Sequence, residues 1–133
     1  MRVLFGTAPR FQIYFLDDNA YAKEQEFFWV RGTSRADLLF KTPDPVSRLK
    51  LTLGTGPVPA DVVITAGGQR ITRHFARDAG AVIEIPIGAG FPYKGTRVWP
   101  VTIAVNSGFV PMFTSNNLDH RYLGLQVTPE LMP

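Results

Sequence analysis

The chain has 133 residues, 45% hydrophobic and 19% charged, which suits one folded domain with its own core and excludes a disordered chain. Fourteen basic and eleven acidic residues give a formal net charge of +3. The basic residues are scattered along the sequence, so we expect no nucleic-acid partner. Cysteine is absent, which excludes disulfides, zinc–thiolate sites and thiol nucleophiles.

Short β-branched and aromatic segments, separated by turn residues, recur along the chain, and helical periodicity is nearly missing. This pattern predicts an all-β fold, an antiparallel β-sandwich of jelly-roll-like type with about nine strands. We expect residues 1–133 to form a single domain, and the abrupt start in RVLF suggests a domain excised from a longer protein. The nine predicted strands cover residues 11–16, 27–32, 36–42, 49–55, 61–66, 69–75, 81–87, 97–105 and 122–128.

After the first predicted strand, Asp17, Asp18 and Asn19 place three oxygen-bearing side chains in one loop. Hard cations prefer such clusters, so these residues are a candidate calcium site, and calcium is the only cofactor that the sequence suggests. The alternative is an Asx-turn at the strand end, because the spacing of an EF-hand loop is not met. The following stretch, residues 19–28, contains good helix formers and predicts either one or two helical turns or a polar loop.

The middle of the chain carries the clearest strand patterns. Leu49, Leu51 and Leu53 alternate with polar residues, which predicts a strand with one buried face. Gly67-Gly68 lies between two such segments and predicts a tight two-residue hairpin. In 81–87 the isoleucines share one face, and Pro86 favours an edge position because it cannot donate a ladder hydrogen bond.

Aromatic side chains are the main binding signal, because flat rings can stack on sugar rings while polar neighbours bond the hydroxyls. We expect the Gly/Pro-rich loop 88–96 to be the recognition surface, with Tyr93 exposed; core packing is the alternative for Trp29. The candidate ligand-binding residues are Tyr93, Trp99, Trp29, Tyr21, Asn116 and Asn117.

Near the C-terminus, the cluster that contains Asp119, His120 and Arg121 runs directly into an apolar alternating segment. Asp119 and Arg121 are two residues apart and point to the same side of the strand entry, which predicts a structural ion pair. Removing Arg121 should therefore destabilise the fold more than it alters binding.

Signatures of catalysis are missing from the sequence: there is no GxSxG, no HExxH, and no glycine-rich loop followed by the lysine and helix of a phosphate site. We therefore expect no catalytic residues in this chain. An enzyme would require Asp17, Asp18, Asp119 and His120 to converge in space.

Two stretches resemble a known kind of domain. FLDDNAYAKEQEFFWVRG (15–32) is similar to an opening of the form LDD-x-A-(Y/F)…FWV-x-G, and GFVPMFTSNNLDHRYLGLQV (108–127) to F-x-P, a polar loop, then D-x-R-x-L-G-V. Both patterns resemble those of β-sandwich domains attached to bacterial membrane-bound glycosyltransferases and related cell-envelope proteins. The chain departs from them at Met112 and Phe113, which add apolar bulk, and at Leu125, where valine is frequent.

This resemblance implies a non-catalytic accessory module that binds or positions an oligosaccharide or polysaccharide in the bacterial cell envelope. It implies a periplasmic or extracytoplasmic location, with an upstream membrane domain in the same protein; without the resemblance, a cytoplasmic location is expected. No apolar run is long enough to span a bilayer, so we expect no direct membrane insertion. The alternatives are a structural or assembly domain that mediates protein–protein contact or oligomerisation, and a small carbohydrate-active enzyme.

Overall fold

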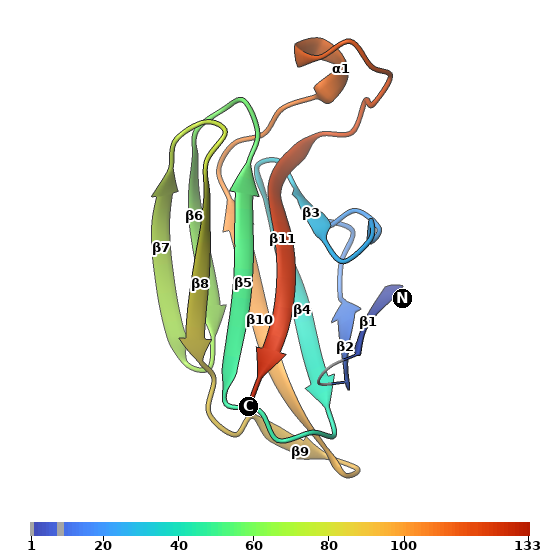
Figure 1. Cartoon of the computed structure of the whole chain (residues 1–133), viewed down its shortest axis with the longest axis vertical. Coiled ribbons are helices and arrows are strands. Elements are labelled where there is room, and N and C mark those ends of the chain that lie inside the picture. The colour runs from blue at the N-terminus through green and yellow to red at the C-terminus, as the bar shows by residue number, and fades with distance from the viewer. Residues whose placement is uncertain (1, 8–9) are drawn as a thin grey trace.

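The chain is almost entirely β-strand in the computed structural model, which describes residues 2–7 and 10–133 (Figure 1). The strands form two sheets with antiparallel pairing throughout, which confirms the predicted fold class. The elements are β1 (Arg2–Thr7), β2 (Arg10–Phe15), β3 (Phe28–Arg31), β4 (Ser34–Thr42), β5 (Arg48–Thr55), β6 (Ala60–Ala66), β7 (Gln69–Phe75), β8 (Gly80–Pro86), β9 (Phe91–Tyr93), β10 (Thr96–Val105), α1 (Pro111–Thr114) and β11 (Leu123–Met132).

The two sheets face each other as layers. Sheet A has the order β1-β2-β4-β10-β6-β7, with β9 paired to one end of β10, and sheet B has the order β3-β11-β5-β8. Figure 1 shows sheet B in front of β6, β10 and β4 of sheet A, with the loop that contains α1 (residues 106–122, the α1 loop) projecting from one end of the sandwich and β9 at the other.

The connectivity is that of a jelly roll. The chain pairs with itself as one long folded hairpin, in which β3 pairs with β11, β4 with β10, β5 with β8, and β6 with β7. Winding this hairpin alternates the strands between the layers and places β11 next to β5, and β10 next to β6. These neighbours define the double Greek key of eight-stranded jelly rolls. Strands β1 and β2 extend sheet A beyond β4.

The core lies between the sheets and is formed by the inward positions of each alternating strand. Leu49, Leu51 and Leu53 of β5 are buried, as their alternation predicted. Thr42 is the single buried polar residue in the described part of the chain, and its hydroxyl donates to the Arg10 carbonyl. Further buried side chains come from both sheets: Phe28, Val30, Ile85, Leu125 and Leu131 from sheet B, and Ile13, Leu38, Phe40, Ile64, Trp99 and Ile103 from sheet A.

Two local predictions are confirmed. Gly67 and Gly68 have φ of 57° and 77° and connect β6 to β7 as the predicted two-residue hairpin. Pro86 ends β8, which lies at the edge of sheet B, where a missing backbone donor costs no ladder bond.

The residues that the structure describes form eleven strands, where the sequence predicted about nine. The nine predicted segments correspond to β2–β8, β10 and β11, while β1 and the short β9 were not among them. Strand β11 also continues past the predicted end at residue 128 and includes Pro129. At that point β11 has only β5 as a neighbour, since β3 pairs with Leu123–Val127 alone, so a proline is tolerated there.

In the stretch 19–28, residues 19–27 form a loop with two isolated bridges and Phe28 begins β3, so of the two alternatives the loop is correct. The single helix in residues 2–7 and 10–133 is α1, a turn of four residues with Pro111 at its start. Within the same residues, no helix has the length and apolar character needed to cross a membrane.

Candidate functional site

The outer faces of the two sheets differ in chemistry. On sheet B, Lys50 of β5 lies opposite Glu84 of β8 on one side and Glu130 of β11 on the other, which makes a solvated ladder of opposite charges. On sheet A, the outward positions next to β9 are aromatic and aliphatic. Contiguous exposed apolar surface marks binding sites more often than a charged, solvated surface does, so the outer face of sheet A is the better candidate for a binding site.

Strands β2 and β4 supply one wall of this surface. Their register places Gln12 opposite Lys41 and Tyr14 opposite Leu39, so all four side chains project outward together. The Lys41 ammonium lies 5.2 Å from the centre of the Tyr14 ring, and the Tyr14 hydroxyl donates to the Gln12 amide oxygen over 3.3 Å. These contacts hold the Tyr14 ring next to two polar groups.

The hairpin of β9 and β10 supplies the opposite wall. Lys94 and Gly95 have φ of 47° and 77° and turn the chain tightly, so that Tyr93 pairs with Thr96. The Thr96 hydroxyl donates to the Tyr93 carbonyl, and the Lys94 ammonium lies 5.4 Å from the Tyr93 ring centre. Phe91 and Tyr93 are 46% and 51% exposed, so both rings remain available for contact.

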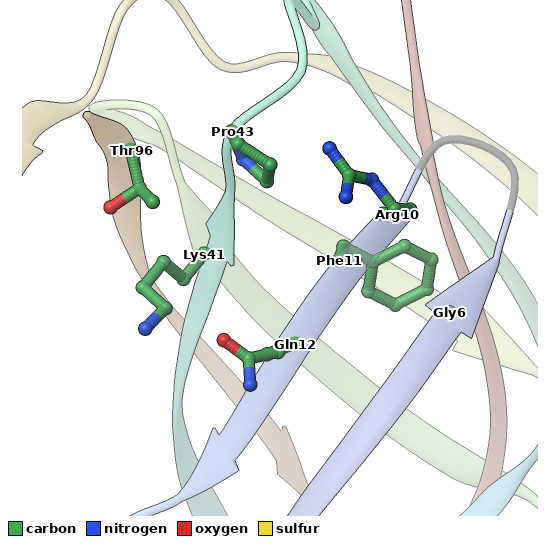
Figure 2. A pocket seen from close by; sticks show the side chains of 7 residues that line it. All are labelled: Gly6, Arg10, Phe11, Gln12, Lys41, Pro43 and Thr96. Carbon is green, nitrogen blue, oxygen red and sulfur yellow. The ribbon is translucent and has the colours of Figure 1, made fainter.

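Between these walls lies an open hollow of about 410 Å³. A second hollow of about 570 Å³ adjoins it and shares Lys41; Figure 2 shows Lys41 and Gln12 side by side within it. A third, of about 640 Å³, shares Phe91 and lies at the β6–β7 hairpin, where residues that follow β8 also line it. We call the three together the sheet A groove. The central hollow is lined by Tyr14, Leu16, Leu39, Lys41, Phe91, Tyr93 and Val98.

Of the predicted ligand-binding residues, Tyr93 lies in the sheet A groove, as expected for an exposed residue of the 88–96 loop. Trp99 also lines the third hollow, but an exposed Trp99 ring is wrong, because its side chain packs in the core, is 2% exposed, and donates its indole N–H to the Gly88 carbonyl over 3.2 Å. The alternation of β10 explains this burial, because Trp99 shares the inner face with Val101 and Ile103. It therefore offers no platform for stacking.

The other predicted ligand-binding residues do not gather around Tyr93. Trp29 is half-buried and packs edge-on against Phe109, with ring centres 5.8 Å apart. The Tyr21 hydroxyl accepts the Tyr122 backbone N–H over 2.9 Å. Asn116 and Asn117 are exposed in the α1 loop, where Asn117 accepts the Asp119 N–H.

The Asp17 carboxylate has the geometry of the Asx-turn alternative. One oxygen accepts the Asn19 N–H over 2.8 Å, and the other accepts the Asp37 N–H of β4 over 3.0 Å. The Asn19 amide donates in turn to the Arg35 carbonyl. In residues 2–7 and 10–133, no three His, Asp or Glu side chains converge as a metal site would require.

Asp119 and Arg121 form the predicted ion pair. The Arg121 guanidinium donates to both Asp119 carboxylate oxygens, over 3.0 and 2.7 Å, and also lies 3.0 Å from Glu24 and 5.5 Å from the Tyr21 ring centre. Chiefly through the side-chain hydrogen bonds, Arg121 holds the pKa of Asp119 at about 2, below its usual value near 3.8. Through Glu24 and Tyr21, Arg121 joins the α1 loop to the loop before β3.

Asp17 and Asp119, two of the residues that an enzyme would need to bring together, are instead engaged separately. Asp17 bonds the backbone at the start of its loop and β4, while Asp119 bonds Arg121. The exposed His74 lies 2.7 Å from Asp61, on β7 and β6.

Sequence reasoning missed Tyr14, Lys41 and Phe91 as members of the groove. The outward alternation of Gln12 and Tyr14 in FQIYFL was present as a signal. The strand order could not be read from the sequence. Only the placement of β2 beside β4, and of β9 beside β10, brings these residues together.

Comparisons with known proteins report fold likeness only. No family model and no curated protein sequence matches the chain. Among solved structures, the Drosophila melanogaster CENP-C cupin domain is 14% identical with a TM-score of 0.33, over 96% of this chain and 75% of that one. Vicilin from Corylus avellana (hazelnut) is also 14% identical, with a TM-score of 0.29, over 91% of this chain and 33% of that one. At this similarity neither structure bears on the site, and the jelly roll rests on the strand order itself.

Proposed function

We propose that this jelly roll is a non-catalytic module that binds carbohydrate along the sheet A groove. The observation that carries the proposal is the set of three exposed or half-buried rings, Tyr14, Phe91 and Tyr93, around one open hollow. Sugar rings present an apolar face that packs on aromatic rings, and an edge of hydroxyls that needs hydrogen-bonding partners.

Polar groups stand where those hydroxyls would lie. The Gln12 amide can donate and accept, and the Lys41 ammonium can donate, and both flank the Tyr14 ring. The hollow itself is lined by aromatic, aliphatic and basic side chains, which suits binding; glycoside hydrolysis would instead use two carboxylates across a cleft.

The proposal includes a place in the bacterial cell envelope. The resemblance of residues 15–32 and 108–127 to glycosyltransferase-associated domains supports an extracytoplasmic location and an upstream membrane domain in the same protein. Binding a glycan there would hold the polymer near the catalytic domain.

Replacing Tyr93 by alanine tests the proposal. Oligosaccharides selected on a glycan array would be titrated calorimetrically against wild type, Tyr93→Ala and the control Phe113→Ala. Phe113 is 78% exposed but lies in α1, outside the groove. We expect Tyr93→Ala to weaken binding about fivefold, in line with ~1 kcal/mol for a stacked ring, while Phe113→Ala binds like wild type. Equal affinities in all three proteins would contradict the proposal, as would no binding at millimolar glycan.

A second candidate is an assembly domain that contacts copies of itself through the α1 loop. Met112, Phe113 and Leu118 are 39%, 78% and 86% exposed. The loop that carries them projects beyond the sandwich (Figure 1). Sedimentation of wild type and of a Phe113→Ser/Leu118→Ser variant separates the two functions. An oligomer that the double substitution dissociates would favour assembly; a monomer in both would leave glycan binding as the better account.

A further inference from the structure

We infer that the glycan bound in the sheet A groove is acidic: a sugar chain that carries carboxylate groups. This inference rests on the proposed function and adds the class of ligand to it. The inference is based on the charge of the groove and on its length. A sugar ring could stack on Tyr93 without either feature.

The sheet A groove carries basic side chains. Lys41 lines the two hollows on one side of Phe91, and Arg70 lines the hollow on the other side. Lys94 lies against the Tyr93 ring. Within residues 2–7 and 10–133, none of these three cations forms a salt bridge. Their charges are therefore available to a ligand.

No Asp or Glu is among the described residues that line the three hollows. Asp37 on β4 is already paired with Arg35 at 3.2 Å, and Asp44, which follows β4, is paired at 3.6 Å with Arg10 of the second hollow. The potential over the groove is therefore positive, and it attracts anions while disfavouring cations.

The sheet A groove is long enough for several sugar rings. From Gln12 on β2 to Arg70 on β7 the groove crosses β4, β10 and β6. Four strand spacings of ~4.8 Å make this span about 19 Å, which is several sugar rings long. Lys41 and Arg70 lie towards opposite ends of it, so one extended chain with a repeating carboxylate can pair with both cations while a ring stacks on Tyr93 between them.

A neutral chain could use the stacking surface but would leave both cations unpaired. A single small anion would pair with one cation and leave the rest of the groove empty. Separated cations with aromatic rings between them suit a chain that carries both repeating carboxylates and sugar rings, which is the chemistry of uronic-acid polysaccharides.

Matched pairs of glycans test this inference. The probes are oligogalacturonate and its methyl ester, and carboxymethyl-dextran and dextran, so that each pair differs in charge on a common backbone. Affinities would be measured by calorimetry at low and high salt. We expect the charged member of at least one pair to bind at least tenfold more tightly, with a preference that falls as salt rises.

Charge-removing variants locate the effect. Arg70→Gln should reduce the preference for the charged chain about threefold to tenfold and leave binding of the neutral chain unchanged, whereas Lys41→Gln, which also removes a donor to sugar hydroxyls, should weaken both chains but the charged chain about threefold to tenfold more. Lys50→Gln makes the same charge change on the outer face of sheet B and should alter neither. Melting temperatures of all three variants confirm folding.

The outcomes separate the two proposals. Equal affinity within both pairs, or a charge preference that survives both groove variants, overturns the acidic ligand and leaves carbohydrate binding standing. No binding by any of the four chains overturns both.

Discussion

Arg121 shows how one side chain can tie together segments that are distant in sequence. Its guanidinium bonds Asp119 in its own loop, Glu24 in the loop before β3, and the face of Tyr21. The Arg121 and Asp119 side chains are each 28% exposed, so water screens these charges in part. The bidentate geometry places the pair above an ordinary surface salt bridge.

Replacing Arg121 by alanine should lower the free energy of unfolding by about 1–2 kcal/mol, because it removes two ion pairs and a cation–π contact at once. Chemical denaturation measures the change. The control is Arg77→Ala, which removes an exposed pair with Asp78 and should cost about 0.5 kcal/mol or less. An unchanged melting temperature combined with lost glycan affinity would overturn the structural role of Arg121.

The same pair predicts a pH dependence. Since the pKa of Asp119 is about 2 in the folded protein and near 3.8 otherwise, its stabilisation is complete above about pH 4 and is lost as the pH falls towards 2. Discounted for solvent exposure, the loss is about 1 kcal/mol. Denaturation of wild type and Asp119→Asn at pH 2, 3 and 5 should show the two stabilities converging at low pH. A constant difference between them across this range would refute the assignment.

At the scale of the elements, the β6–β7 hairpin depends on two glycines with different surroundings. A Cβ at Gly67 would lie 2.5 Å from the Cα of Ile87, whereas a Cβ at Gly68 would meet nothing within 4 Å. Both glycines have positive φ, a backbone conformation that other residues adopt only at a cost. Only Gly67 is also closely packed against the chain after β8.

Gly67→Ala should therefore destabilise the protein by about 3 kcal/mol, and Gly68→Ala by about 1 kcal/mol, which is the cost of the left-handed conformation alone. Thermal unfolding of both variants gives the comparison. Equal losses of stability would mean that the contact with Ile87 is not the cause.

The elements also show what could be predicted from the sequence. Alternation in RLKLTL and AVIEIPI predicted which side chains are buried, and Gly67-Gly68 predicted the hairpin, because these signals are local. Trp99 was misassigned because an aromatic residue next to a Gly/Pro-rich loop looks exposed until its strand register is known. The groove was missed for the same reason, since β2, β4 and β9 become neighbours only through the strand order.

The whole molecule presents two sheet faces with different chemistry. The outer face of sheet B carries alternating charges across β11, β5 and β8 and is suited to water. The outer face of sheet A carries the open groove, with Tyr14, Phe91 and Tyr93 on its walls and unpaired cations along the described part of its lining. The jelly roll accounts for this difference: its core lies between the sheets, and one outer face remains free for a ligand.

The most direct measurement is an NMR titration of the labelled protein with the oligosaccharide that binds best on a glycan array. The account predicts that amide shifts change at Gln12, Tyr14, Lys41, Phe91 and Tyr93, while β5 and the α1 loop stay unchanged. No shift changes at millimolar ligand, or changes confined to the α1 loop, would contradict the claim that the sheet A groove is the carbohydrate site.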